Sequence, residues 1–293
     1  MKTLTQPSTC KRRAAFTLIE LLMVVTIIGI LAAIGIPAIQ GLTSSNKSAI
    51  ATLQLADDLK FARSKAISER TTVYVVFVPP NFTGLALGFP LGHTPTAADI
   101  ALTNRNTRLI EKLLNQKYTS YALYADRRVG DQPGRPSSKY ITPWRSLPEG
   151  SFVAAREFER TANAQVWKDT PVENRPLPYA QFPFPSDTVD CPAFDLPYVA
   201  FNHLGQMVVL TYKAGNVVQS VPGLPEDEII NLGRGGIFYS RDGSTGKLVN
   251  EALGAPYTPA DITEVPPGNS NNLWVRVNWL TGRSQIDQPQ IVN

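Results

Sequence analysis

An apolar run covers residues 16–37, and a single charge, Glu20, interrupts it. Three basic residues, Lys11, Arg12 and Arg13, come directly before the run. A helix over these residues would be about 33 Å long, which is enough to cross a hydrocarbon core of about 30 Å. The pattern therefore predicts a transmembrane helix with its basic end in the cytoplasm and the rest of the chain outside.

After this run the apolar positions recur at intervals of three and four residues. Leu55, Leu59 and Ala62 follow this spacing, with charged residues between them. Residues 38–70 are therefore predicted to form an amphipathic helix that continues the first one, with a looser stretch at 41–45.

After residue 70 the side-chain pattern changes from a spacing of three and four residues to a spacing of two. Val73, Val75 and Phe77 alternate with other β-branched and aromatic residues, which is typical of a strand. A short helix is expected around 97–116. Further strands are expected in 118–124, 151–153, 198–210 and 274–286, the last with a turn at 281–283. Prolines are dense in 171–197, so this stretch is predicted to be an irregular covering segment without a central strand. The expected fold class is α+β: a long N-terminal helix, first transmembrane and then amphipathic, packed on a mostly antiparallel β-sheet head.

The net charge of +4 comes from the N-terminus. Four of the 28 basic residues (Lys2, Lys11, Arg12, Arg13) lie in the first fifteen positions, which contain no acid, and the rest balance the 24 acids. A chain cut after these positions is near neutral, so overall charge gives no argument for a nucleic-acid partner. It would also keep only one cysteine, Cys191, and no intrachain disulfide could form.

The N-terminal residues resemble a known processing signal. A short basic leader, two alanines and then Phe-Thr-Leu-Ile-Glu before a long apolar helix resemble the signal of type IV pilins and type II secretion pseudopilins. The resemblance implies that prepilin peptidase cuts between Ala15 and Phe16 and methylates the new amine of Phe16. Ala15 departs from the family, which usually has Gly there. A secretory signal peptide is the competing interpretation, although its apolar region is normally shorter.

The same resemblance gives roles to two further residues. Glu20 takes the acidic position that the family keeps for assembly, and Pro37 takes the position of a helix-kinking proline. A carboxylate in such a run is costly to bury alone. If subunits stack as a bundle, the Phe16 amine of one chain could pair with Glu20 of a neighbour and offset that cost.

Later motifs are similar to one branch of this family, the H-type pseudopilins and T-type minor fimbrial pilins. They are the Ala62-Arg63-Ser64 triplet before the first strand, a Leu-Pro-x-Gly turn at 147–150, a Phe-Asn-x-x-Gly hairpin at 201–205 and the closing segment 274–286. Some T-type pilins capture DNA through Gly-Arg-x-Arg in that closing segment. Gly282 and Arg283 match, but Gln285 replaces the second Arg, so Arg283 is a candidate DNA contact that lacks its usual companion.

No catalytic or metal-binding pattern is present in the sequence. The two histidines, His93 and His203, have no Cys or carboxylate at zinc-ligand spacing, and GxSxG, HExxH and a phosphate loop are absent. The sequence therefore predicts no enzyme activity, no cofactor and no metal site.

These patterns predict four parts: a leader at 1–15, a transmembrane assembly segment at 16–37, a joining helix at 38–70, and a β-rich head at 71–293 with a Pro-rich insertion at about 79–197. The expected function is a minor pilin or pseudopilin in the inner membrane, with its head in the periplasm. Its expected partners are prepilin peptidase, other pilins and membrane lipid. A DNA-capturing competence pilin and a singly anchored periplasmic binding protein are the alternatives.

Overall fold

The computed structural model describes the chain in stretches: 18–80, 109, 112–127, 130–131, 137–159, 171, 175–187, 191, 193–213, 216–220, 226–239, 261–265, 267–268 and 273–287. At 34–46, 210–213 and 216–220 only the backbone is described. The chain divides into two units, Met1–Ser45 and Asn46–Asn293, and the second is called the head below.

Helix α1 spans Leu18–Glu69. It ends where Arg70 adopts a left-handed conformation (φ 51°) and the Thr71 N–H donates to the Ala66 carbonyl at 3.2 Å. This bond is the one that closes a Schellman cap. The predicted looser stretch at 41–45 is wrong, because the backbone is helical throughout. Extending an existing helix is less costly than starting a new one.

Eight strands form the first sheet: β1 (Val73–Phe77), β2 (Ser120–Ala125), β3 (Lys139–Tyr140), β4 (Arg145–Ser146), β6 (Tyr179–Pro183), β7 (Ala193–Phe201), β8 (Met207–Lys213) and β9 (Asn216–Ser220). Their order is β3-β2-β1-β7-β8-β9, with β4 beside β2 and β6 beside β7, and all pairings are antiparallel. Strand β1 is central, since Val73 is opposite both Ala125 and Phe201.

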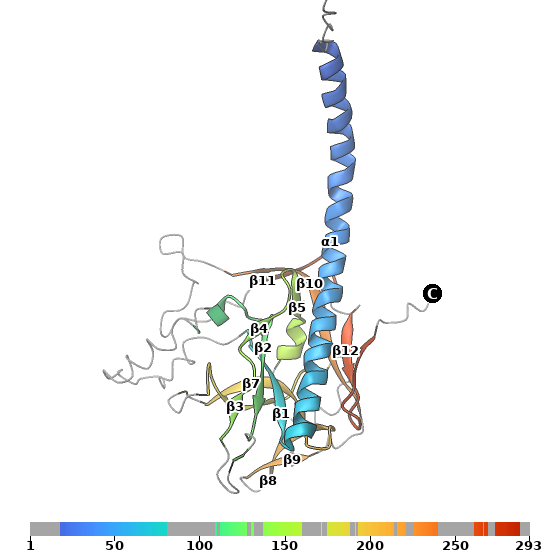
Figure 1. The fold of residues 1–293 in the computed structure, drawn as a ribbon. Coiled ribbons are helices and arrows are strands. Elements are labelled where there is room, and N and C mark those ends of the chain that lie inside the picture. Colours follow the sequence, from blue (N-terminus) through green and yellow to red (C-terminus); the bar gives the residue numbers. More distant parts are fainter. Residues whose placement is uncertain are drawn as a thin grey trace, which may run out of the picture. The chain divides into compact units, whose positions relative to one another are not determined.

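Five strands form the second sheet: β5 (Ser151–Val153), β10 (Glu228–Phe238), β11 (Asp261–Glu264), β12 (Trp274–Val277) and β13 (Ser284–Asp287). The order is β11-β10-β12-β13, with β5 also on β10, and these pairings are antiparallel too. A 3₁₀ turn, η2 (Ala155–Phe158), follows β5. Figure 1 shows the strands gathered around the last turns of α1.

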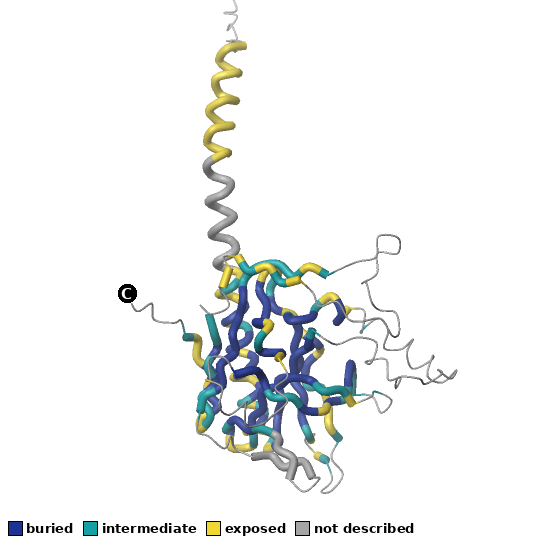
Figure 2. Tube along the Cα trace, turned by 180° about the vertical axis from the view of Figure 1, so that it is seen from behind, coloured by how far each residue is buried: buried dark blue, intermediate teal, exposed yellow. Residues whose placement is uncertain are grey.

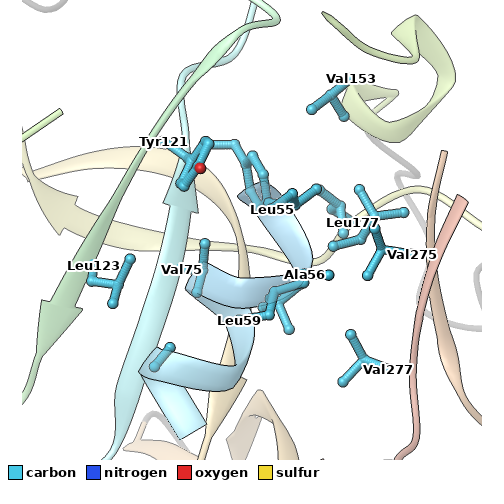
Figure 3. Packing of buried hydrophobic residues seen from close by; sticks show 14 of the residues in the cluster. Leu55, Ala56, Leu59, Val75, Tyr121, Leu123, Val153, Leu177, Val275 and Val277 are labelled. Carbon is cyan, nitrogen blue, oxygen red and sulfur yellow. The ribbon is translucent and has the colours of Figure 1, made fainter. Parts of the chain in front are cut away.

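The main core of the head lies between α1 and the two sheets. Leu55 and Leu59 of α1 lie between β1–β2 on one side and β12 on the other, where Val277 is buried (Figure 3). Small residues on the same helix face, among them Ala62 and Ala66, are also fully buried, so the helix backbone can approach the strands closely.

The first sheet is buried on its other face as well. Val73, Val75 and Phe77 face the main core, whereas Tyr74 and Val76 belong to a second cluster. That cluster is covered largely from the proline-dense stretch, by Ala180, Phe182, Phe184, Phe194 and Leu196. This explains why β1 is apolar at successive positions rather than at alternate ones.

The α+β fold class with a mostly antiparallel head is confirmed. The proline-dense stretch does cover the core, but the expectation that it is irregular is wrong: β6 and the first half of β7 form a ladder there. Pro197 fits because this half of β7 pairs only with β6, so the missing N–H costs no second ladder bond. Residues 79–197 supply β2 to β6, and their status as an insertion stays a prediction.

The three turn motifs are found where the sequence placed them. Gly150, Gly205 and Gly282 have positive φ angles of 86°, 78° and 61°, and each comes directly before or between strands. The closing segment 274–286 is a hairpin of β12 and β13, and the predicted turn at 281–283 joins the two strands. Most of the expected helix near 97–116 lies outside the described residues.

Candidate functional site

The start of α1 exposes a continuous apolar surface. Every residue from 18 to 33, called the apolar segment below, is exposed in the isolated chain (Figure 2). The exposed fraction of Leu18 is 83% and that of Leu31 is 64%. The other large apolar side chains in this segment are Ile19, Leu21, Leu22, Met23, Val24, Val25, Ile27, Ile28 and Ile30.

An apolar surface of this size is unfavourable in water unless lipid or another protein packs against it. Each large apolar side chain gains about 1.5–3 kcal/mol when it leaves water. A helix that is apolar on all sides is one that is surrounded by lipid or by other protein, and soluble monomers rarely expose so large a contiguous patch. The apolar segment is therefore the strongest candidate for a functional surface in the described chain.

The polar residues of the apolar segment fit such a setting. Thr26 donates its hydroxyl to the carbonyls of Leu22 (3.0 Å) and Met23 (2.8 Å), so the hydroxyl is satisfied within the helix. Glu20 lies in the first turn of α1, where the helix dipole favours a negative charge.

Several predicted site residues lie beyond the described part of the chain. Ala15 and Phe16 lie outside it, and Pro37 is within α1 but its side chain is not described. The cleavage position and the pairing of the Phe16 amine with Glu20 therefore stay predictions. In the described residues, no helix is both long enough and apolar enough to cross a membrane. The span at 16–37 also stays a prediction.

Comparison with known families gives one match. The family described as "Prokaryotic N-terminal methylation motif" matches residues 10–36. Residues 10–36 carry the prepilin-type signal of type IV pilins and pseudopilins. The match includes the predicted cleavage position, Glu20 and the whole apolar segment, and it supports a type IV pilin-like protein. No curated protein and no solved structure matches the chain.

The signal implies two kinds of partner. A prepilin-type signal is processed by prepilin peptidase, and pilins assemble with other pilins. It suggests a structural subunit rather than an enzyme. In the stretches that the structure describes, no three or more His, Cys, Asp or Glu side chains group as metal ligands. His203 lies in an exposed turn, and His93 is outside these stretches.

Arg283, the candidate DNA contact, lies on the surface. It follows Gly282 in the β12–β13 turn, and its side chain is exposed. Gln285 is exposed on β13. Nearby cations are already engaged, because Arg276 pairs with Asp287 at 2.8 Å and Lys65 pairs with Glu69 at 3.0 Å.

A polar network that was not predicted from the sequence joins α1 to the first sheet. Asp58 is buried, accepts a 2.7 Å bond from the Tyr121 hydroxyl and forms an ion pair with Arg145. Gln54 donates to the same hydroxyl at 2.9 Å. Burial, followed by the Asp58 carboxylate, raises the pKa of Tyr121. In the sequence Asp58 lies in a charged run, which is typical of a surface position. Its burial becomes apparent only when β2 is seen to pack against this part of α1.

Two further buried carboxyl groups lie by the second sheet and were also missed. Glu157 of η2 accepts bonds from the Asn231 backbone N–H (3.2 Å) and side-chain amide (2.6 Å). Burial raises the pKa of Glu157 to about 8. Burial, and then the charge of Glu157, raises the pKa of Glu228 on β10 to about 8 as well. Arg175 partly offsets this shift in Glu228 but is itself bonded to Glu226 at 2.6 Å.

Proposed function

We propose that this chain is a minor pilin or pseudopilin, a structural subunit of a type II secretion pseudopilus or a type IV pilus. The observation that carries the proposal is the methylation motif at 10–36, which contains the exposed start of α1. Apart from Glu20, Thr26 and Gly29, the residues of this apolar segment are all apolar. In this proposal prepilin peptidase cuts between Ala15 and Phe16 and methylates Phe16. Glu20 then pairs with a neighbouring subunit's amine.

The proposal includes a location. The helix at 16–37 is held in the inner membrane before assembly, with the basic leader in the cytoplasm and the head in the periplasm. The exposed apolar segment supports this, since lipid covers it before assembly and neighbouring helices cover it afterwards.

The head half of α1 offers a second contact surface for assembly. Its outward face carries three large apolar side chains, Ile50, Leu53 and Phe61, which are 54%, 52% and 41% exposed. They are exposed because the opposite helix face, with Leu55 and Leu59, is already buried in the core. The outward face supports packing against a neighbouring subunit.

Three turn motifs favour the H-type pseudopilin and T-type minor pilin branch. The Leu-Pro-x-Gly turn leads into β5, the Asn202 to Gly205 turn joins β7 to β8, and the closing segment forms β12 and β13. We propose membership of this branch on these matches. A secretion pseudopilus and an extended pilus need the same subunit features, so the filament type would be assigned by expressing the chain with each assembly system.

Processing is tested by expressing the full chain with and without prepilin peptidase and determining the N-terminus by mass spectrometry. A product that begins at N-methylated Phe16 only with the peptidase is expected. Ala15→Gly restores the family's usual residue and should be cut at least as fast. A chain that starts at Met1 in both cases would contradict the proposal and indicate a plain anchored protein, while a start near Ile36 would indicate a secreted one.

Assembly is tested separately with Glu20→Ala. This variant should be processed normally but should enter sheared filaments poorly, because the neighbour's amine would lose its partner. Asp57→Ala is the matched control, since Asp57 is an exposed carboxylate of the same helix (side chain 69% exposed). Normal filament incorporation of Glu20→Ala would rule out the proposed role of Glu20.

DNA capture is a second candidate function. It is favoured by one observation: Arg283 is exposed, and within the described residues its guanidinium has no ion-pair partner. A gel shift with duplex DNA and the processed protein tests it, with Arg283→Gln as the variant. Phosphate contacts predict binding that weakens steeply with salt and falls in the variant. Gln285→Arg, which restores the family motif, should strengthen any such binding.

A further inference from the structure

Two turns of the head share an uncommon composition. The β7–β8 turn reads Asn202-His203-Leu204-Gly205, and the β12–β13 turn reads Asn278-Trp279-Leu280-Thr281-Gly282. Each begins with Asn, has Leu near its tip and ends in a Gly of positive φ. Small polar residues and Gly dominate most turns, so a leucine at both tips is notable.

The asparagines hold both turns in fixed conformations. The Asn202 side-chain oxygen accepts from the backbone N–H groups of Leu204 and Gln206, each at 2.9 Å. The Asn278 side-chain oxygen accepts from the N–H and the hydroxyl of Thr281, also at 2.9 Å. Neither turn needs a partner to become ordered.

The turns are packed against each other and against α1. A Cβ on Gly282 would lie 2.0 Å from the Gly205 carbonyl oxygen, so only glycine permits this approach. Arg63 of α1 donates from the same nitrogen to the carbonyls of Thr281 (2.6 Å) and Gly205 (3.2 Å). The two leucine tips therefore belong to one rigid surface.

This surface is apolar at its centre. Leu204 is 63% exposed and Leu280 is 50% exposed, so neither leucine contributes much to the core. Ile67 of α1 is 40% exposed, and its Cδ1 is 2.7 Å from where a Gly205 side chain would begin. Leu204, Leu280 and Ile67 together are called the double-turn surface.

An exposed positive charge lies beside the double-turn surface. Arg283 is exposed and has no ion pair within the described stretches. The adjacent acid, Asp227, is already used: it accepts from the Asn278 amide (3.0 Å) and the Trp279 N–H (3.1 Å), and it lies 3.9 Å from Arg276. A partner with carboxylates would be complementary to this positive charge.

We propose that the double-turn surface docks an acidic segment of a protein partner that packs large apolar side chains against Leu204 and Leu280. This goes beyond assembly of a filament and does not depend on it. Rigid leucines on preorganised turns suit such a segment, because little entropy is lost on their side when it binds. A nucleic acid would use Arg283 but offers no apolar side chains to Leu204 and Leu280.

The test uses the full chain in detergent micelles and a random peptide library displayed on phage. The expected result is enrichment of peptides that combine Asp or Glu with large apolar residues. An enriched peptide is then synthesised with a fluorophore, and its Kd is measured by anisotropy. Leu204→Ser with Leu280→Ser should weaken binding about tenfold or more, as expected when two central anchors are lost. Arg283→Gln should weaken it about two- to fivefold at low salt.

The matched control is Val265→Ser, which removes a comparably exposed apolar side chain (57%) that lies outside both proposed contact surfaces. It should leave the peptide's Kd unchanged. Thermal unfolding of the double variant checks that it remains folded, and if it does not, Arg283→Glu gives an independent charge-reversal test. The proposal is overturned if no acidic apolar peptide is enriched, or if the enriched peptide is insensitive to both changes. Leucine-dependent binding to phosphatidylglycerol vesicles or to duplex DNA, without peptide binding, would also overturn it.

Discussion

Helix α1 contains two stretches with apolar side chains that differ in their burial. In the apolar segment, 18–33, all side chains are exposed. In the stretch 51–66, one face is fully buried against two sheets, whereas the opposite face is exposed. The sequence shows why they differ: the first stretch is apolar on every side, and the second is apolar mainly on one side.

This difference in burial indicates whether each stretch packs within its own chain or against other molecules. Leu55 and Leu59 find their partners within the same chain, so changes there act on folding. The apolar segment has no cover in the isolated chain, so changes there act on insertion or assembly. The following predictions test this division, from the largest expected effect on head stability to the smallest.

Truncating a leucine to alanine should destabilise the head in the second stretch but not in the apolar segment. Leu59→Ala should lower the free energy of unfolding of the head by about 2–5 kcal/mol, because it leaves a cavity in the main core. Leu22→Ala should change it by less than about 0.5 kcal/mol, because Leu22 is exposed. Urea unfolding of the full chain in detergent, followed by tryptophan fluorescence, measures both. Equal losses of unfolding free energy in the two variants would contradict the division between the two stretches.

A rise in pH should destabilise the head. Glu157 and Glu228 have pKa values of about 8 in the fold against an ordinary value of 4.5. Between these values the unfolded chain releases protons that the folded chain keeps, so stability falls as pH rises, by at most about 1.4 kcal/mol per pH unit for each group. From pH 6 to 8 the loss should be at most roughly 4–5 kcal/mol for the two groups together.

The matched variants are Glu228→Gln and Glu149→Gln. Glu228→Gln should reduce the pH dependence by about half, since one of the two buried carboxyls no longer titrates. Glu149 is exposed, and its replacement should leave the slope as it is. Urea unfolding at several pH values gives the slopes. A wild-type stability that is flat or rises between pH 6 and 8 would refute the assignment of these two groups.

Two neighbouring aspartates of α1 should differ in their effect. Asp58→Asn should cost about 1–3 kcal/mol, because it removes the charge that Arg145 and the buried Tyr121 hydroxyl use. Asp57→Asn should cost less than about 0.5 kcal/mol, because its pair with Lys60 is exposed to solvent. The fall in melting temperature is measured for both variants. A larger fall for Asp57→Asn than for Asp58→Asn would contradict the burial of Asp58 and the exposure of Asp57.

The smallest effect on stability is expected on the outward face of α1. Leu53→Ser and Phe61→Ser should each change the unfolding free energy of the head by no more than about 0.5 kcal/mol. Both should reduce incorporation into sheared filaments if a neighbouring subunit packs on this face. If a variant with both substitutions enters filaments normally, the apolar segment is the only part of α1 that assembly requires.

Local patterns were reliable where one local cause decides the structure. The alternation from Val73 to Phe77 predicted β1, and Gly205 and Gly282 marked turns because both need a positive φ. The spacing of Leu55 and Leu59 predicted the buried helix face. For the candidate site, the apolar run and Glu20 could be found from sequence, because they form one continuous stretch.

Features that depend on pairing across the chain were not predictable. The proline-dense stretch was expected to be irregular, but the ladder between β6 and β7 depends on which strand is adjacent to β7. The burial of Asp58 depends on Arg145, eighty-seven residues away in sequence. The double-turn surface likewise exists only because Arg63 binds two turns that are far apart in the chain.

The sequence by itself determined the processing signal, the exposed apolar segment, the helix and the turns, because periodicity and single-residue backbone preferences are local properties. The tertiary structure decided the division of the head into two sheets, the burial of Glu157 and Glu228, and the meeting of the two leucine-tipped turns. These features depend on which distant segments pack together, and that choice is made by the free energy of the whole core rather than by any one stretch.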